Sequence, residues 1–135
     1  MATIQVTKDN FEGLLNKNGI VILDFWASWC GPCRMFEPIF EKSSEKHADI
    51  SFGKVNTEEQ QDLAAAFSIR SIPTLMIFRE KILLFQQAGA LPEAALEEII
   101  GKVRELDMNM VRAEIAKEAT KEDQGTQPDV KAAAN

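Results

Sequence analysis

The chain has 135 residues, of which 45% are hydrophobic and 27% charged, the composition of an ordinary globular domain with a hydrophobic core. Its 15 basic and 21 acidic side chains give a net charge of −6, which argues against a nucleic-acid partner because such proteins usually carry a basic surface. No apolar stretch approaches the roughly 18 residues that a membrane-spanning helix needs, so no membrane partner is expected.

The first half of the chain alternates between predicted strands and predicted helices. Residues 20–26 are nearly all apolar and branched or aromatic, which is typical of a central strand covered on both faces. Apolar residues at helical spacing follow, and they predict a helix from the two cysteines to about Lys46. The remaining elements of this half are strands at 3–6 and 50–55, a helix that ends near Asn16, and a helix at 58–67.

The second half of the domain begins with a predicted hairpin, strands 74–79 and 82–88, whose connection is too short for anything but antiparallel pairing. The connecting residues include no glycine, so we expect a type I turn without positive φ. Pro92 then opens a helix that continues to about Leu106. This order predicts an α/β fold with a mixed sheet of about five strands, flanked by about four helices.

Residues beyond 106 form a C-terminal extension to the predicted domain at 1–106. Residues 107–119 have the composition of a helix, whereas 120–135 are polar and aperiodic, and we expect them to be disordered. Two interpretations of residues 96–119 stay open. Their apolar stripe belongs either to a helix whose last turns fray, or to a contact with the apolar edge strand, a second copy of the chain or a partner protein.

The chain has only two cysteines, Cys30 and Cys33, and three kinds of use compete for them. A zinc site needs four ligands, whereas this pair supplies two and the only histidine, His47, at most one more. Inert core cysteines are not expected at a strand–helix junction with Gly and Pro between them. Redox use explains the spacing best. With no N-terminal signal-peptide pattern, the pair predicts a protein of the reducing cytoplasm.

The segment Trp-Ala-Ser-Trp-Cys-Gly-Pro-Cys-Arg at 26–34 resembles the active-site segment of thioredoxins. The similarity covers roughly residues 2–106 and includes Asp24, Lys54, the Ile-Pro-Thr run at 72–74, and Gly89. It implies a thioredoxin fold and a disulfide reductase that needs no cofactor or metal beyond its own redox-active disulfide. The implied partners are disulfide-containing client proteins and an NADPH-dependent thioredoxin reductase.

The resemblance and the helix start together assign roles to the two thiols. Cys30, nearest the helix N-terminus, is the expected nucleophile, because unpaired N–H groups and the helix dipole favour its thiolate. We expect it to be the more exposed of the two. Cys33, one turn inside the helix, would resolve the mixed disulfide by attacking Cys30.

Asp24 stands in an otherwise apolar central strand, where burial should raise the pKa of its carboxyl group. One interpretation makes it the general base that removes the proton of Cys33. The other interpretation is an aspartate at the edge of the strand, in contact with water. Lys54 would moderate the charge of Asp24, or else be a solvated residue at a strand end.

By the same resemblance, the Ile72–Pro73 peptide bond should be cis and lie against the cysteines. An extended client peptide would pair with the backbone there. The substrate-binding residues implied by the resemblance are Trp29, Gly31, Pro32, Ile72, Pro73 and Gly89. Two other functions stay open: a dedicated reductant whose extension selects one client, and a chaperone-like scaffold whose apolar surface matters more than its thiols.

Overall fold

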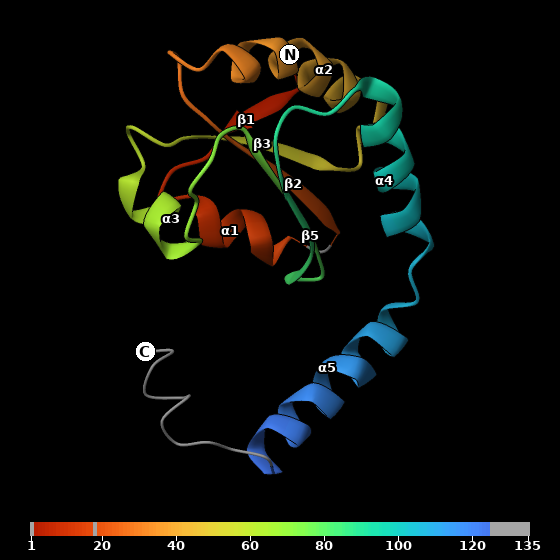
Figure 1. Ribbon diagram of the computed structural model, residues 1–135. Coiled ribbons are helices and arrows are strands. Elements are labelled where there is room, and N and C mark those ends of the chain that lie inside the picture. The colour runs from red at the N-terminus through yellow and green to blue at the C-terminus, as the bar shows by residue number, and fades with distance from the viewer. Residues whose placement is uncertain (1, 18, 125–135) are drawn as a thin grey trace. The chain divides into compact units, whose positions relative to one another are not determined.

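The computed structural model describes residues 2–17 and 19–124, and of 121–124 only the backbone. Strands and helices alternate along most of this part of the chain (Figure 1). Their bounds are β1 (Thr3–Gln5), α1 (Phe11–Asn16), β2 (Ile20–Trp26), α2 (Gly31–Lys46), β3 (Ser51–Asn56), α3 (Gln61–Ala66), β4 (Thr74–Arg79), β5 (Ile82–Ala88), α4 (Glu93–Glu105) and α5 (Met108–Gln124).

The strands form one mixed sheet in the order β1-β3-β2-β4-β5. β3 is parallel to both β1 and β2, whereas β4 is antiparallel to both β2 and β5. β2 is therefore the central strand of the sheet, and the loop that follows its last residue leaves the sheet at the middle of the edge formed by the strand ends. The predicted α/β fold, with a mixed five-stranded sheet and a C-terminal helix, is confirmed.

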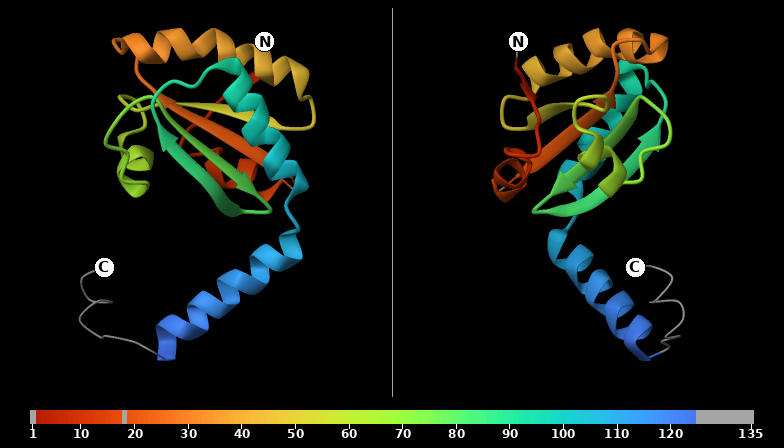
Figure 2. Two further views of the ribbon diagram at one scale, coloured as in Figure 1. Left: turned by 45° about the vertical axis from the view of Figure 1, so that its right-hand side comes forward. Right: turned by 90° about the vertical axis from the view of Figure 1, so that its left-hand side faces the viewer.

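The side chains of β2 alternate between two hydrophobic cores, one on each face of the sheet. Val21 and Leu23 belong to the core that α1 and α3 cover. Ile20 and Ile22 belong to the core that α2 and α4 cover (Figure 2). Successive residues of a strand point to opposite faces, so Asp24 shares the face of Ile20 and Ile22 and lies under α2. The fold thus places a carboxyl group in an apolar layer beneath the helix that carries Cys33.

The chain divides into two compact units between Val103 and Arg104, close to the predicted domain boundary. Part of the apolar stripe predicted over residues 96–119 is not available for other contacts, because Leu96 and Val103 are buried in the core of the first unit. α5 continues five residues past the predicted end at 119, since its sequence contains no glycine or proline to stop it. The rest of the predicted disordered tail, 125–135, lies outside the described residues.

The hairpin between β4 and β5 turns through Glu80 and Lys81, which have φ angles of 54° and 70°. Arg79 pairs with Ile82, so these two residues are the whole loop. A two-residue hairpin loop favours the mirror-image type I′ turn, because its twist matches that of the strands. The prediction of a type I turn without positive φ is therefore wrong: strand twist outweighs the local cost of a left-handed conformation.

Replacing Lys81 with glycine is expected to stabilise the protein. A non-glycine residue in the left-handed region costs roughly 1–2 kcal/mol, part of which glycine loses again through its greater freedom in the unfolded chain. We expect a net gain of about 0.5–1 kcal/mol in the free energy of unfolding, measured by urea titration. Lys81→Ala is the control, since it removes the same side chain but keeps the strain. Equal midpoints for the two variants would contradict the explanation.

Candidate active site

Cys30 caps the N-terminus of α2, immediately after the loop that leaves β2. Its backbone is extended, and its Sγ accepts a hydrogen bond from the backbone N–H of Cys33, with an N–S distance of 3.2 Å. Pro32 stands in the first turn, where its missing N–H is not needed. The free N–H groups and positive dipole end of the helix therefore stabilise negative charge on the sulfur of Cys30.

Cys30 and Cys33 are joined as a disulfide, with 5.2 Å between their Cα atoms. Cys30 is 4% exposed and Cys33 2%, so the difference between them has the expected direction but is very small. The expectation that Cys30 is the more exposed of the two is met only by this small margin, because both residues are buried in the oxidised form. The physical reason is close packing, because each sulfur covers the other and a second loop lies against Cys30.

That second loop contains Ile72 and Pro73, and the peptide bond between them is cis. The carbonyl oxygen of Ile72 lies 3.6 Å from Cys30 Sγ. The hydroxyl of Thr74 donates to the carbonyl of Ser71, which closes the loop on itself. The pattern of the sequence did not single out this hydroxyl, although a threonine after Pro73 at the start of a strand was a visible signal.

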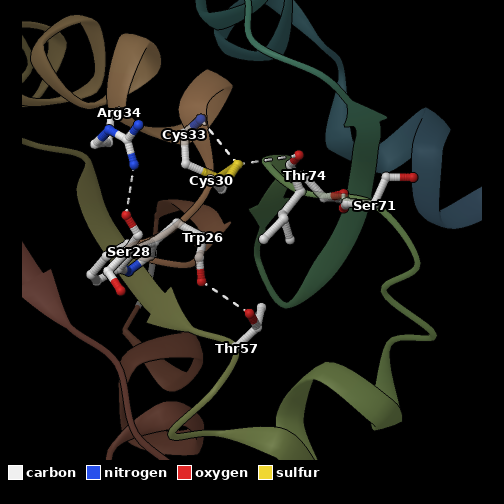
Figure 3. The surroundings of a disulfide bond; sticks show 9 residues. Trp26, Ser28, Cys30, Cys33, Arg34, Thr57, Ser71 and Thr74 are labelled. Carbon is white, nitrogen blue, oxygen red and sulfur yellow. Dashed lines mark hydrogen bonds between the residues drawn. A yellow bond between two sulfur atoms is a disulfide. The ribbon is translucent and has the colours of Figure 1, made fainter.

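The loop that leads into α2 is held by two hydrogen bonds. The N–H of Cys30 donates to the carbonyl of Ala27 over 3.3 Å. The guanidinium of Arg34 donates to the carbonyl of Ser28 over 2.9 Å (Figure 3). Between these anchors Trp29 is 66% exposed, which is unusual for so large an apolar side chain. The loop thus presents an apolar surface beside the disulfide.

The predicted substrate-binding residues come from three parts of the chain, which are the segment around Cys30, the loop before β4 and the glycine after β5. Pro32 is exposed and Gly31 partly buried, both in the first turn of α2. Ile72 is partly buried, and the N–H of Gly89 donates to the carbonyl of Pro73 over 2.7 Å. Gly89 has a φ of 103°, a conformation that only glycine adopts readily.

Asp24 is 1% exposed, and its Oδ1 has no hydrogen-bond partner among the described residues. Burial raises the pKa of Asp24 from 3.8 to about 7, while the positive charge of Lys54 lowers it and the negative charge of Glu37 raises it. This is the direction that the sequence predicts. A carboxyl group with a pKa near 7 can both accept and release a proton under physiological conditions.

Lys54 stands directly beside Asp24, because the two residues are partners in the register of β2 and β3. Its Nζ lies 4.7 Å from the centre of the Trp26 ring, within the range of a cation–π interaction. The side chain is only 15% exposed. Of the two interpretations of Lys54, the structure therefore excludes the solvated residue at a strand end.

Glu37 is a residue of this site that sequence reasoning missed. Its Oε2 lies 3.0 Å from Lys54 Nζ, so the lysine is paired with a carboxylate of α2. Glu37 comes four residues after Cys33, which on a helix places the two on one side, a turn apart. That spacing was a usable signal, but its meaning depends on the strand register that brings Lys54 under α2.

Neither a metal cluster nor a membrane-spanning segment is found in the described part of the chain. No three or more His, Cys, Asp or Glu side chains of residues 2–17 and 19–124 are grouped so as to hold a metal ion. Over the same residues, each helix is too short or too polar to cross a bilayer.

Comparison with known proteins points to one family. A family model described as thioredoxin matches residues 2–102. A Streptomyces coelicolor protein named "Putative thioredoxin 2" is 53% identical over 117 residues, 87% of each chain. A thioredoxin of Pyropia yezoensis is 40% identical over 104 residues, which are 76% of this chain and 97% of the relative. One from Coprinus comatus is 42% identical over 96 residues, 70% of this chain and 90% of the relative.

The similarity to the Streptomyces coelicolor protein extends beyond the predicted domain. Its 117 matched residues exceed the 106 of the domain, so at least 11 of them fall in the C-terminal extension. The match to the Pyropia yezoensis protein, at 104 residues, fits within the domain length. Part of the extension therefore has a counterpart in another protein.

Proposed function

This chain belongs to the thioredoxin family, and from that membership we propose how the residues around its disulfide divide the reaction between them. The protein is a thiol–disulfide oxidoreductase, whose Cys30–Cys33 pair exchanges two electrons with protein disulfides. In this family a thioredoxin reductase returns the oxidised pair to the dithiol. The proposal therefore concerns the individual residues and the order in which they act.

In the first step the thiolate of Cys30 attacks one sulfur of a client disulfide. A bond forms between Cys30 Sγ and that sulfur, the client S–S bond breaks, and the second client sulfur leaves as a thiolate. The observation that carries this assignment is the position of Cys30 as the cap of α2, with the N–H of Cys33 at 3.2 Å from its Sγ. That N–H and the helix dipole stabilise a thiolate relative to a thiol at this position.

In the second step Cys33 attacks Cys30 and releases the reduced client. The proton of the Cys33 thiol passes to the carboxylate of Asp24, directly or through a water molecule. The Cys30–Cys33 disulfide forms as the mixed disulfide breaks, and the client leaves with both sulfurs reduced. Three observations support Asp24 in this role: it lies under α2, its Oδ1 has no partner among the described residues, and its pKa is raised to about 7.

The client docks as an extended peptide beside the disulfide. The carbonyl of Ile72, next to Cys30 Sγ, is the backbone group that would accept its hydrogen bond, and the cis Pro73 fixes the direction of that carbonyl. Trp29 supplies an exposed apolar surface on the other side of the sulfur. The remaining contacts in this proposal come from Gly31, Pro32 and Gly89.

Insulin reduction in a mixture with NADPH and a thioredoxin reductase tests the proposed reaction. We expect the wild-type protein to sustain NADPH consumption, and Cys30→Ser to fall to the rate without protein. Insulin that stays intact while the wild-type pair is confirmed to be reduced would remove the proposed function. Reduction of insulin by Cys30→Ser would remove the assignment of the nucleophile instead.

The extension gives the proposal a second, separate part. We propose a catalytic domain at 1–106, with α5 as a contact surface for a second copy or a partner protein, since Val111 and Ile115 lie one turn apart on that helix. Deletion of residues 108–135 should then lower the mass measured in solution by more than the mass of the deleted segment. A mass lowered by the deleted segment alone, with an unchanged melting temperature, would remove this part alone.

A cytoplasmic location is also part of the proposal. Both cysteines of the chain belong to the reactive pair, so none is left for a structural disulfide. Proteins of reducing compartments use cysteine in this way.

A further inference from the structure

An ion pair connects α2 to the strand beside Asp24. Glu37 Oε2 and Lys54 Nζ are 3.0 Å apart, and the side chains are 50% and 15% exposed respectively. Glu37 stands one turn after Cys33, and Lys54 is the register partner of Asp24. The helix that carries the resolving cysteine is therefore linked, through one carboxylate and one ammonium group, to the strand position next to its proposed base.

Lys54 is held from more than one direction. The ring of Trp26 lies 4.7 Å from its Nζ, and Trp26 comes two residues after Asp24 on the same face of β2. The backbone carbonyl of Trp26 in turn accepts hydrogen bonds from the N–H and the hydroxyl of Thr57 (Figure 3). Because these contacts restrict the ammonium group, removing Glu37 would leave its charge beside Asp24 rather than free in solvent.

We propose that Glu37 is a positioning residue for the resolving step: by pairing with Lys54 it weakens the pull of the lysine on Asp24 and so keeps Asp24 able to take up the proton of Cys33. This inference rests on the proposed role of Asp24 as the base. Glu37 itself touches neither client nor sulfur in this scheme. It acts only through the charge that Asp24 experiences.

The charges around Asp24 support this arrangement. The charged groups that act on Asp24 are Lys54 of β3, which lowers its pKa, and Glu37 of α2, which raises it. Cys33 of α2 is bonded to Cys30 and carries no charge. From β4 the register partner of Asp24 is Leu75, which carries no charge. Burial has the largest effect on the carboxyl group, and the two charged side chains oppose each other on top of it. Glu37 thus opposes the effect of a cation that lowers the pKa of Asp24.

The test is the titration of Asp24 in Glu37→Gln, followed by the carboxyl carbon signal of that residue in NMR. We expect the midpoint of the Asp24 titration to move to lower pH, by up to about 1 pH unit, because the negative charge that opposes Lys54 is lost. The pH dependence of single-turnover peptide reduction should move in the same direction. Lys54→Met should move both midpoints to higher pH, and in the Lys54→Met background the effect of Glu37→Gln should shrink.

Glu41→Gln is the matched control, since it removes the same charge one turn further along α2, and Glu41 is not among the charges that act on Asp24. Its Asp24 midpoint should equal that of the wild type. Equal midpoints for Glu37→Gln and the wild type, or equal movement in both glutamine variants, would overturn the proposal. If instead the NMR midpoint moves while turnover is the same at every pH, Glu37 does act on Asp24, and the assignment of Asp24 as the base has failed.

Discussion

Asp24→Asn is expected to raise the free energy of unfolding by about 2–4 kcal/mol at pH 8 and by much less at pH 4. The pKa of Asp24 is about 7 in the folded protein and should be near its ordinary value of 3.8 in the unfolded chain. Below 3.8 both states carry the proton and the folded state has no penalty. Between pH 3.8 and about 7, Asp24 is ionised in the unfolded chain but still protonated in the folded protein. The wild-type protein is therefore progressively destabilised as the pH rises through this range.

The full shift of the Asp24 pKa corresponds to about 4 kcal/mol of stability. The lower end of the expected range allows for the cost of burying the asparagine amide, whose oxygen would replace Oδ1 and also lack a hydrogen-bond partner. Urea titrations at pH 4 and pH 8 measure the difference. Asp62→Asn serves as the control, because Asp62 is 85% exposed and its pair with Lys8 spans 3.7 Å. It should change stability by less than about 0.5 kcal/mol at both pH values. If Asp24→Asn changed stability equally at pH 4 and pH 8, the destabilisation would not come from ionisation of a buried Asp24.

The sequence predicted the fold and the reactive pair because both depend on local patterns. Alternation of apolar runs with helical spacing determines the order of elements, and the position of Cys30 and Cys33 after residues 20–26 places them at a helix start. The raised pKa of Asp24 was predictable for the same reason, since a carboxyl group in an apolar strand has few neighbours to compensate its burial.

The features that the sequence left open or did not reveal depend on relations between elements. The partnership of Asp24 with Lys54 follows from the register of β2 and β3, and a shift of one residue would send Lys54 to the other face. Glu37 gains its meaning only when α2 lies over that register. The left-handed Glu80 and Lys81 follow from the twist of two paired strands, and the burial of Cys30 follows from the loop that Ile72 brings against it.

Cys33→Ser is expected to abolish turnover and to leave Cys30 covalently joined to its clients. Without the resolving thiol the first step still forms the mixed disulfide, but nothing within the protein attacks Cys30 to release it. We expect insulin reduction to fall by at least about 10³-fold, as when a member of a catalytic group is removed. Non-reducing gel electrophoresis should show adducts with a disulfide-containing peptide that disappear when dithiothreitol is added.

The double variant Cys30→Ser/Cys33→Ser is the control that separates chemistry from docking. It keeps Trp29 and the Ile72–Pro73 loop, so a scaffold that recognises clients by its apolar surface would retain them equally well in both variants. A reductase retains them only where Cys30 is present, and only through a bond that a reductant breaks.

Asp24→Asn adds a third comparison, because it removes the proposed base and keeps both cysteines. This variant should form adducts at the wild-type rate but release them slowly, and its release rate should fall most at the pH values where wild-type Asp24 is ionised. Wild-type release rates in that variant would leave Cys33 to lose its proton by another route, while the assignment of the two cysteines would stand.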